Sequence, residues 1–188
     1  MTPRIVHFND PVLRKKGAKV VKFDDSLRRF AGAMVDAMHA ARGIGLAAQQ
    51  VGEALQLCVV DLRETSADFD WQLDGSRPPL ELFMPMVLAN PVVEAAPGPL
   101  DSAEEGCLSF PGINGDVARP DEITVRYQDE HGTPHVLRCN GLFARCIQHE
   151  ADHLAGVLFI DRMDDATRER LEPELKELRR ATRAAARK

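Results

Sequence analysis

The sequence predicts a single α+β domain, in which mixed or antiparallel strands surround a central helix and a further helix ends the chain. Three observations predict this fold class. The chain has 188 residues, a length that suits one domain. Short β-like runs separated by Gly- and Pro-containing turns occupy its middle. Three other segments have apolar residues at the spacing of amphipathic helices.

The first expected helix covers residues 24–42, where apolar side chains recur every three or four positions. An aspartate can cap its start, and Gly43 can close its end. A loop of small residues follows at 43–52. The next segment, QLCVVDL at 56–62, has the composition of a strand.

The middle of the chain is expected to supply most of the strands. Residues 61–81 are polar, acidic and proline-bearing, which indicates a surface loop or excursion. Residues 82–94 have strand composition with interrupting prolines, which suggests an edge or a bend. Residues 122–128 and 135–139 flank the turn sequence DEHGTP and predict a hairpin.

Two helices are expected after the strands. The first covers residues 140–156, and the second covers 164–188 and is entered or broken at Pro173. We therefore divide the chain into one domain, residues 1–166, and a charged, largely basic helical tail, residues 167–188.

Composition and charge exclude several classes of protein. The chain has 24 Lys and Arg against 29 Asp and Glu, a net charge of −5, which argues against a uniformly basic nucleic-acid binder. No run approaches the roughly 18 apolar residues of a membrane-spanning helix, and the first residues lack the apolar core of a signal peptide. We therefore expect a cytoplasmic protein. In that setting its 4 cysteines are core residues or metal ligands more often than disulfides.

The strongest chemical signal is an H-E-x-x-H motif in the expected helix 140–156. His149 and His153 are four residues apart, so their imidazoles lie on nearly one face of the helix and can bind one metal ion. Glu150 lies beside them, where it can take a proton from a water molecule on the metal. An apolar stripe leads to the histidines, which indicates that this face is buried.

A catalytic metal site of this kind needs a third protein ligand. The metzincin pattern would require a histidine where Phe159 stands, and the glutamates of residues 169–174 lie in a strongly charged segment that looks solvated. The upstream candidate is Cys107, which follows a glycine in a loop between strand-like segments. A thiolate with two imidazoles suits zinc or iron(II) and leaves one coordination position for water.

Three motifs in this order resemble the peptide deformylase family. They are GIGLAAQQ at 43–50, EGCLS at 105–109 and QHEADH at 148–153. Members of this family are metallohydrolases that remove the formyl group from the N-formylmethionine of new bacterial or organellar polypeptides. The resemblance extends from about residue 11 to residue 163, and the three motifs in sequence are highly specific.

The resemblance implies the metal ligands and the proton-transfer group. It makes Cys107, His149 and His153 the ligands of one divalent metal ion, with iron(II) as the native metal and zinc or another divalent ion as the alternative. It makes a water molecule on that metal the nucleophile, and Glu150 the general base and later the general acid.

The resemblance also implies how the substrate is held. The side-chain amide of Gln50 and the backbone N–H of Leu108 become donors to the developing oxyanion. The backbone at Ile44 and Gly45 runs beside the substrate like an added strand, a mode of binding with little sequence selectivity.

The methionine side chain of the substrate needs an apolar pocket, and Leu142 and Cys146 are available on the helix before His149. Arg145 departs from the family, many of whose members have an aliphatic residue at this position. Its stem is expected to line the pocket while its guanidinium reaches water. Asp152 is expected either to pair with Arg119, which stands where the family has a basic residue, or to be exposed.

Two other functional classes stay open. One is a zinc endopeptidase of the HExxH type, which is disfavoured because a downstream ligand is missing. The other is a non-catalytic ribosome-binding relative, which is suggested by KELRRATRAAARK at 176–188. The expected partners are N-formylmethionyl nascent peptides and, through this tail, the ribosome, without membrane or DNA.

Overall fold

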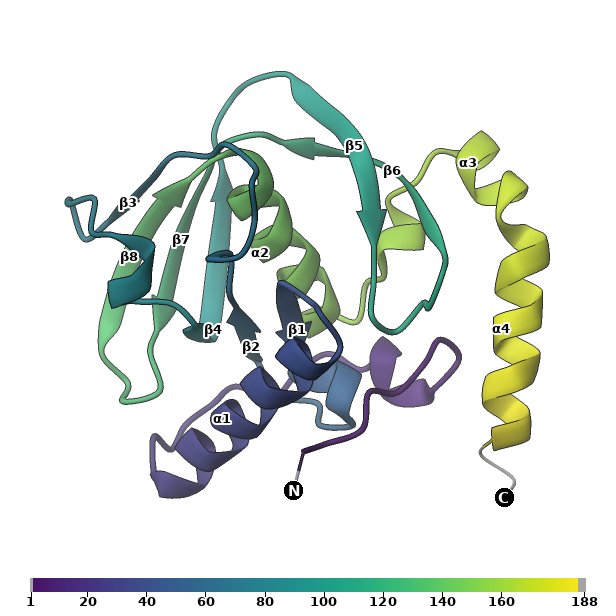
Figure 1. Ribbon diagram of the computed structural model, residues 1–188, viewed down its shortest axis with the longest axis horizontal. Helices are drawn as coiled ribbons and strands as arrows, with labels where there is room; N and C mark the ends of the chain where they lie inside the picture. Colours follow the sequence, from purple (N-terminus) through teal and green to yellow (C-terminus); the bar gives the residue numbers. More distant parts are fainter. Residues whose placement is uncertain (1, 186–188) are drawn as a thin grey trace.

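The computed structural model describes residues 2–185 and has the α+β architecture that the sequence predicts (Figure 1). The helices are α1 (Asp25–Ala40), α2 (Gly141–Leu154), α3 (Asp165–Arg170) and α4 (Glu172–Ala185). The strands are β1 (Gly45–Ala47), β2 (Leu57–Val60), β3 (Trp71–Leu73), β4 (Met86–Ala95), β5 (Leu100–Gly106), β6 (Asn114–Pro120), β7 (Ile123–Gln128) and β8 (Pro134–Cys139).

The larger sheet is antiparallel, with the strand order β1-β2-β4-β7-β8-β3, and β5 and β6 form a separate antiparallel pair. The hairpin predicted at 122–128 and 135–139 is confirmed as β7 and β8, in which Ile123 lies opposite Cys139. β1 has a partner on one side only, so it is an edge strand of the sheet.

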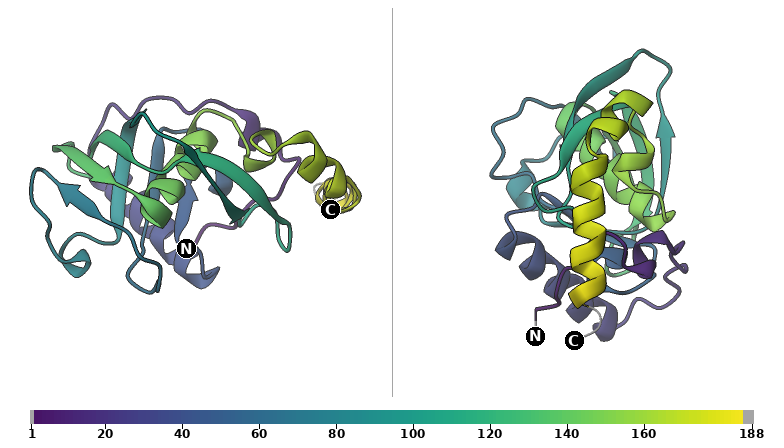
Figure 2. Two further views of the ribbon diagram at one scale, coloured as in Figure 1. Left: turned by 90° about the horizontal axis from the view of Figure 1, so that it is seen from above. Right: turned by 90° about the vertical axis from the view of Figure 1, so that its right-hand side faces the viewer.

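Helix α2 lies between the larger sheet and the β5–β6 pair (Figures 1 and 2). Its apolar side chains, among them Phe143 and Ile147, are fully buried against strand residues such as Leu88 and Val125. Helix α1 packs through Met34 and other apolar residues against β1 and β2. Strands β1 and β2 are therefore covered by both helices, which brings β1 against α2.

The predicted helix at 24–42 is confirmed as α1. The Asp24 carboxylate caps it by accepting hydrogen bonds from the backbone N–H groups of Ser26 and Leu27. At its end, the N–H of Gly43 donates to the Met38 carbonyl at 2.9 Å. The chain turns here and enters β1 at Gly45, so part of the expected loop at 43–52 is a strand.

Two strand predictions need correction. The segment 61–81 is not only a loop, because it contains β3, which adds to β8 with Trp71 opposite Cys139. β4 is not an edge strand, because it lies between β2 and β7. The expected bend is present, since the β4–β7 register shifts between Ala89 and Val92 and Asn90 has a φ of 53°. A proline at 91 is tolerated there because a bulge interrupts the ladder of hydrogen bonds.

The expected helix at 164–188 is divided into α3 and α4 at Leu171, and Pro173 is the second residue of α4. Residues 186–188 of this prediction lie outside the described residues. Leu175 of α4 is fully buried in a cluster with Phe8 and Phe110. No helix within residues 2–185 has both the length and the apolar composition to span a membrane.

Candidate active site

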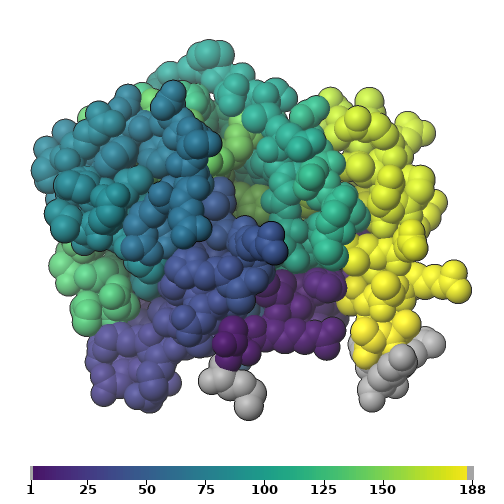
Figure 3. All heavy atoms as spheres, viewed as in Figure 1, coloured from purple at the N-terminus to yellow at the C-terminus, as the bar shows by residue number. Residues whose placement is uncertain are grey.

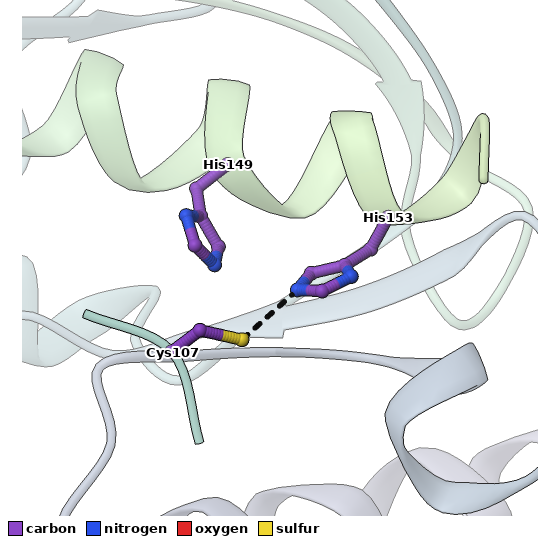
Figure 4. A group of neighbouring side chains, drawn as sticks. All are labelled: Cys107, His149 and His153. Atoms are coloured by element: carbon purple, nitrogen blue, oxygen red, sulfur yellow. Dashed lines mark hydrogen bonds between the residues drawn. The ribbon is translucent and has the colours of Figure 1, made fainter. Parts of the chain in front are cut away.

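Three side chains bring metal-ligand atoms together at the middle of the fold. The Cys107 thiol and one imidazole nitrogen each of His149 and His153 lie within 4.8 Å of one another, and no other such group of three occurs in residues 2–185. Cys107 directly follows β5, and both histidines project from one face of α2, as their spacing predicts (Figure 4). The Sγ atom of Cys107 lies 3.3 Å from Nε2 of His153.

This donor set fits a divalent metal ion. Nδ1 of His149 contacts the Glu105 carboxylate at 2.9 Å, and because a carboxylate accepts, Nδ1 carries the proton and Nε2 is left to bind a metal. Nδ1 of His153 is buried without a hydrogen-bond partner among the described residues, while Nε2 faces Cys107. Burial lowers the pKa of His153, which keeps its imidazole in the neutral, metal-binding form.

A buried ionic network lies behind the two histidines. Arg119 contacts the Glu105 carboxylate at 2.5 and 2.9 Å and the Asp152 carboxylate at 2.9 Å, so the predicted Asp152–Arg119 pair is confirmed. Burial by itself would raise the pKa of Glu105. The hydrogen bonds with Arg119 and His149 overcome this effect and lower that pKa from 4.5 to about 2. Glu105 is therefore ionised and orients the His149 imidazole.

Glu150 occupies a different environment, although it lies on the same helix. Its side chain is buried, and Oε2 has no hydrogen-bond partner among the described residues. Burial raises the pKa of Glu150 from 4.5 to about 7. A carboxyl group of this kind can gain and lose a proton near neutral pH, which is the property that a general acid–base catalyst needs.

Gln50 directs its amide NH₂ toward Cys107, one of the three ligand residues. It lies in the 3-10 turn Ala48–Val51 and is buried. Its Oε1 accepts a hydrogen bond from the backbone N–H of Ala47 at 2.8 Å, which fixes the amide. Nε2 lies 3.4 Å from Sγ of Cys107 and 3.4 Å from Oγ of Ser109. An amide donor is thereby held at the edge of the metal-ligand group.

One pocket of about 480 Å³ brings nearly all the predicted site residues together. Figure 3 shows it as a hollow between the segment that follows α1 and the β5–β6 pair. His153 is the exception, because it is buried beneath the pocket floor. The predicted residues in the lining are Ile44, Gly45, Gln50, Cys107, Leu108, Leu142, Arg145, Cys146, His149 and Glu150.

The structure differs from the sequence-based expectation at Arg145. Its side chain is only 10% exposed, and its guanidinium does not extend into water. The guanidinium instead donates hydrogen bonds to Glu105 and to Asp101, and Arg145 still lines the pocket, as Glu105 does. Phe110, Pro111, Gly112 and Asn114 also line the pocket, which the sequence did not predict because only the fold brings this loop to α2.

The known proteins that this chain resembles are peptide deformylases. The family model described as polypeptide deformylase matches residues 2–169. A peptide deformylase of Opitutus terrae is 60% identical over 187 residues, which cover 99% of this chain and 97% of that protein. One from a Synechococcus strain is 44% identical over 176 residues, or 93% of this chain and 80% of that protein.

Solved structures show the same fold. A peptide deformylase of Synechococcus elongatus in complex with actinonin matches with a TM-score of 0.75 and 41% identity, covering 94% of this chain and 83% of that chain. One from Plasmodium falciparum matches with a TM-score of 0.82 and 35% identity, covering 96% and 98%. The chain therefore belongs to the peptide deformylase family of metal-dependent hydrolases, and Cys107, His149 and His153 form its metal-binding group.

Proposed function

We propose that this chain hydrolyses the formyl amide of N-formylmethionyl nascent peptides, with Glu150 as the group that moves the proton. The reaction breaks the bond between the formyl carbon and the amine nitrogen, adds a water oxygen to that carbon, and releases formate and a free N-terminal amine. The observation that carries this proposal is the buried Glu150 carboxyl group, which has an unpartnered Oε2 and lines the same pocket as the metal ligands Cys107 and His149.

Cys107, His149 and His153 would hold the metal. When bound, a divalent ion supplies Lewis-acid chemistry, because it acidifies water and polarises a carbonyl oxygen. We take iron(II) as the native metal and zinc as the alternative, since a thiolate with two imidazoles suits both. Metal analysis of protein purified without oxygen, with formate release compared after loading with each metal, distinguishes them. Equal metal content but higher turnover with zinc would contradict the choice of iron.

Glu150 is proposed to accept a proton from the attacking water and then to donate it to the departing amine. The formyl oxygen becomes negative when water adds, and the Gln50 amide and the Leu108 backbone N–H are the proposed donors to it. Support for Gln50 comes from the 2.8 Å hydrogen bond that fixes its amide. Loss of one such donor lowers the rate of comparable acyl-transfer enzymes by about 100- to 1,000-fold.

The peptide is proposed to lie along the free edge of β1 at Ile44 and Gly45. Main-chain hydrogen bonds to an edge strand add affinity with little dependence on side chains, which suits an enzyme that accepts many peptides. The methionine side chain would occupy the pocket beside Leu142, Arg145 and Cys146, all of which line it.

The test of this function is formate release from a formyl-methionyl dipeptide by metal-loaded protein. The Glu150→Ala variant should bind the metal normally and lose turnover, whereas Glu94→Ala, a control in an exposed ion pair, should keep both. Retained turnover in Glu150→Ala would remove the assigned base. An absence of formate from the metal-loaded natural sequence would refute the function, and cleavage of internal peptide bonds would favour the endopeptidase.

Residues 167–188 are proposed to form a charged, largely basic tail that packs through Leu175 on the catalytic domain, residues 1–166, and contacts the ribosome with its cations. The support is a cluster of cations on α4, which consists of Lys176, Arg179, Arg180 and Arg183. Such a cluster suits ribosomal RNA, a dense polyanion. The cytoplasm is the proposed place of action because translation delivers formylated chains there.

Co-sedimentation with ribosomes tests the role of this tail. The double variant Arg180→Glu/Arg183→Glu should bind ribosomes more weakly and with a smaller salt dependence, while its turnover of the dipeptide is unchanged. The double variant Lys22→Glu/Arg29→Glu makes the same charge change at exposed positions outside the tail and serves as the control. Equal co-sedimentation of the two double variants would refute the contact.

A further inference from the structure

Arg145 connects three parts of the site through its buried guanidinium. Nη1 donates to Oε1 of Glu105 at 2.9 Å and to the Val117 carbonyl at 2.8 Å. Nη2 donates to the Asp101 carbonyl at 2.8 Å and to the Asp101 carboxylate at 3.0 Å. Asp101 and Glu105 belong to β5, and Val117 belongs to β6. A single side chain of α2 is therefore bonded to both strands of the pair that leads into Cys107.

The Glu105 carboxylate is shared between Arg145 and a metal ligand. Arg145 contacts Oε1, and Nδ1 of His149 contacts Oε2 at 2.9 Å. Because Arg145 and His149 are four positions apart on α2, they lie on one face of the helix. Both therefore contact the Glu105 carboxylate from adjacent turns. The direction of the His149 imidazole therefore depends on where Glu105 is held.

Arg119, a residue of β6, also holds the Glu105 carboxylate. It contacts both Glu105 oxygens and the carboxylate of Asp152, which precedes His153. Arg119 alone would leave the start of β5 without a bond to α2 at this site. Arg145 adds that bond through Asp101, so the two arginines hold β5 against α2 on both sides of His149.

The placement of Arg145 is difficult to explain by pocket lining alone. The Arg145 side chain is only 10% exposed, although its guanidinium is charged. Burial of a charge costs free energy unless hydrogen bonds compensate for it. Four hydrogen bonds compensate here, and all of them go to acceptors on β5 and β6. A planar guanidinium can satisfy these acceptors together, whereas the single ammonium group of lysine cannot.

We propose that Arg145 is a positioning residue of the metal centre. It holds the β5–β6 pair, and with it Cys107, against α2, and it fixes Glu105 so that His149 presents Nε2 to the metal. This inference depends on the metal ligands of the proposed function, but it concerns how they are held rather than the reaction that they support.

The test compares metal binding by Arg145→Leu, Arg145→Lys and Arg126→Leu. Arg126 is the matched control, because its ion pair with Glu94 is exposed on both sides. Affinity for zinc is measured by competition with a chelator, and the absorption spectrum of the cobalt(II)-loaded protein reports ligand geometry. No substrate is present in either measurement. The result for Arg145 therefore does not depend on whether the protein is a deformylase.

Arg145→Leu should bind zinc about tenfold to 100-fold more weakly than the natural sequence, the range known for residues that orient metal ligands, and its cobalt spectrum should change. Arg145→Lys should show a smaller loss, and Arg126→Leu should show neither effect. Arg145→Lys keeps the positive charge and decides the question if the leucine variant does not fold. Natural zinc affinity and an unchanged cobalt spectrum in Arg145→Lys or Arg145→Leu would overturn the proposal.

Discussion

Replacement of Gly45 by alanine gives the most direct test of how β1 packs against α2. A Cβ atom at this position would lie 2.4 Å from Oε1 of Glu150 and 2.9 Å from Sγ of Cys146. The backbone at Gly45 has no positive φ, so an alanine would not be strained by its own conformation. The effect of the substitution therefore comes from crowding of the Glu150 carboxyl group and the pocket wall.

The size of the effect follows from these distances. Non-bonded heavy atoms prefer a separation of about 3.5–4.0 Å, so Glu150 or β1 must move by roughly 1 Å. A displacement of about 1 Å at a catalytic group costs on the order of 100-fold in rate. Overpacking of a buried site costs about 1–3 kcal/mol of unfolding free energy. In a chain of this size each kcal/mol lowers the melting temperature by about 2–4 °C.

The assay is formate release at saturating metal, together with thermal unfolding. Gly45→Ala should lower kcat/KM on the order of 100-fold and should also lower the melting temperature. Gly32→Ala is the matched control, because a Cβ there meets nothing within 4 Å. Gly32 lies within α1, so its replacement should stabilise the protein by about 0.5–1 kcal/mol without loss of turnover. Turnover within about threefold of the natural sequence in Gly45→Ala would refute the packing argument.

Three further predictions concern pH, the core and the metal. The hydrogen bond with Arg63 lowers the pKa of Asp61 from 3.8 to about 2, so the stability that the ionised carboxylate contributes is present above pH 3.8 and is lost as the pH falls through about 2. Urea unfolding at a series of pH values gives the difference in unfolding free energy between the natural sequence and Asp61→Asn. This difference should be constant above about pH 5 and should shrink below pH 3.8. A constant difference down to pH 2 would contradict this pKa. Leu175→Ala should lower the unfolding free energy by about 2–5 kcal/mol, because Leu175 is fully buried where α4 meets the core, and a loss below about 1 kcal/mol would show that α4 is not anchored there. Removal of the metal by a chelator should abolish formate release and lower the melting temperature, and added iron(II) or zinc should restore both; full turnover by metal-free protein would contradict the assigned site.

The metal-binding histidines could be predicted from the sequence because the helix spacing is local. Four residues along an α-helix place His149 and His153 on one face whatever the rest of the chain does. The β7–β8 hairpin was predictable for a similar reason, since a turn sequence lies between two strand-forming segments. Cys107 was selected by the chemistry of its thiol and by family resemblance, and the structure brings it to the histidines.

Other features depend on contacts between distant parts of the chain. β3 has only three residues, which are too few for a sequence pattern to predict a strand, and its pairing with β8 defines it. The direction of the Arg145 guanidinium is decided by Asp101, Glu105 and Val117, which lie 28 to 44 residues away in the chain. A long side chain has many rotamers of similar energy, so the acceptors that surround it in the folded protein decide where its charge goes.

The sequence by itself therefore determined the α+β class, the central helix, the residue types of the metal site and the family. The tertiary structure decided which groups hold that site in place: Glu105 behind His149, Arg119 and Arg145 on either side, and Gly45 against Glu150. The physical reason is the range of the forces involved. Helix periodicity and turn chemistry act over a few residues, whereas buried ion pairs and close packing exist only after distant segments meet.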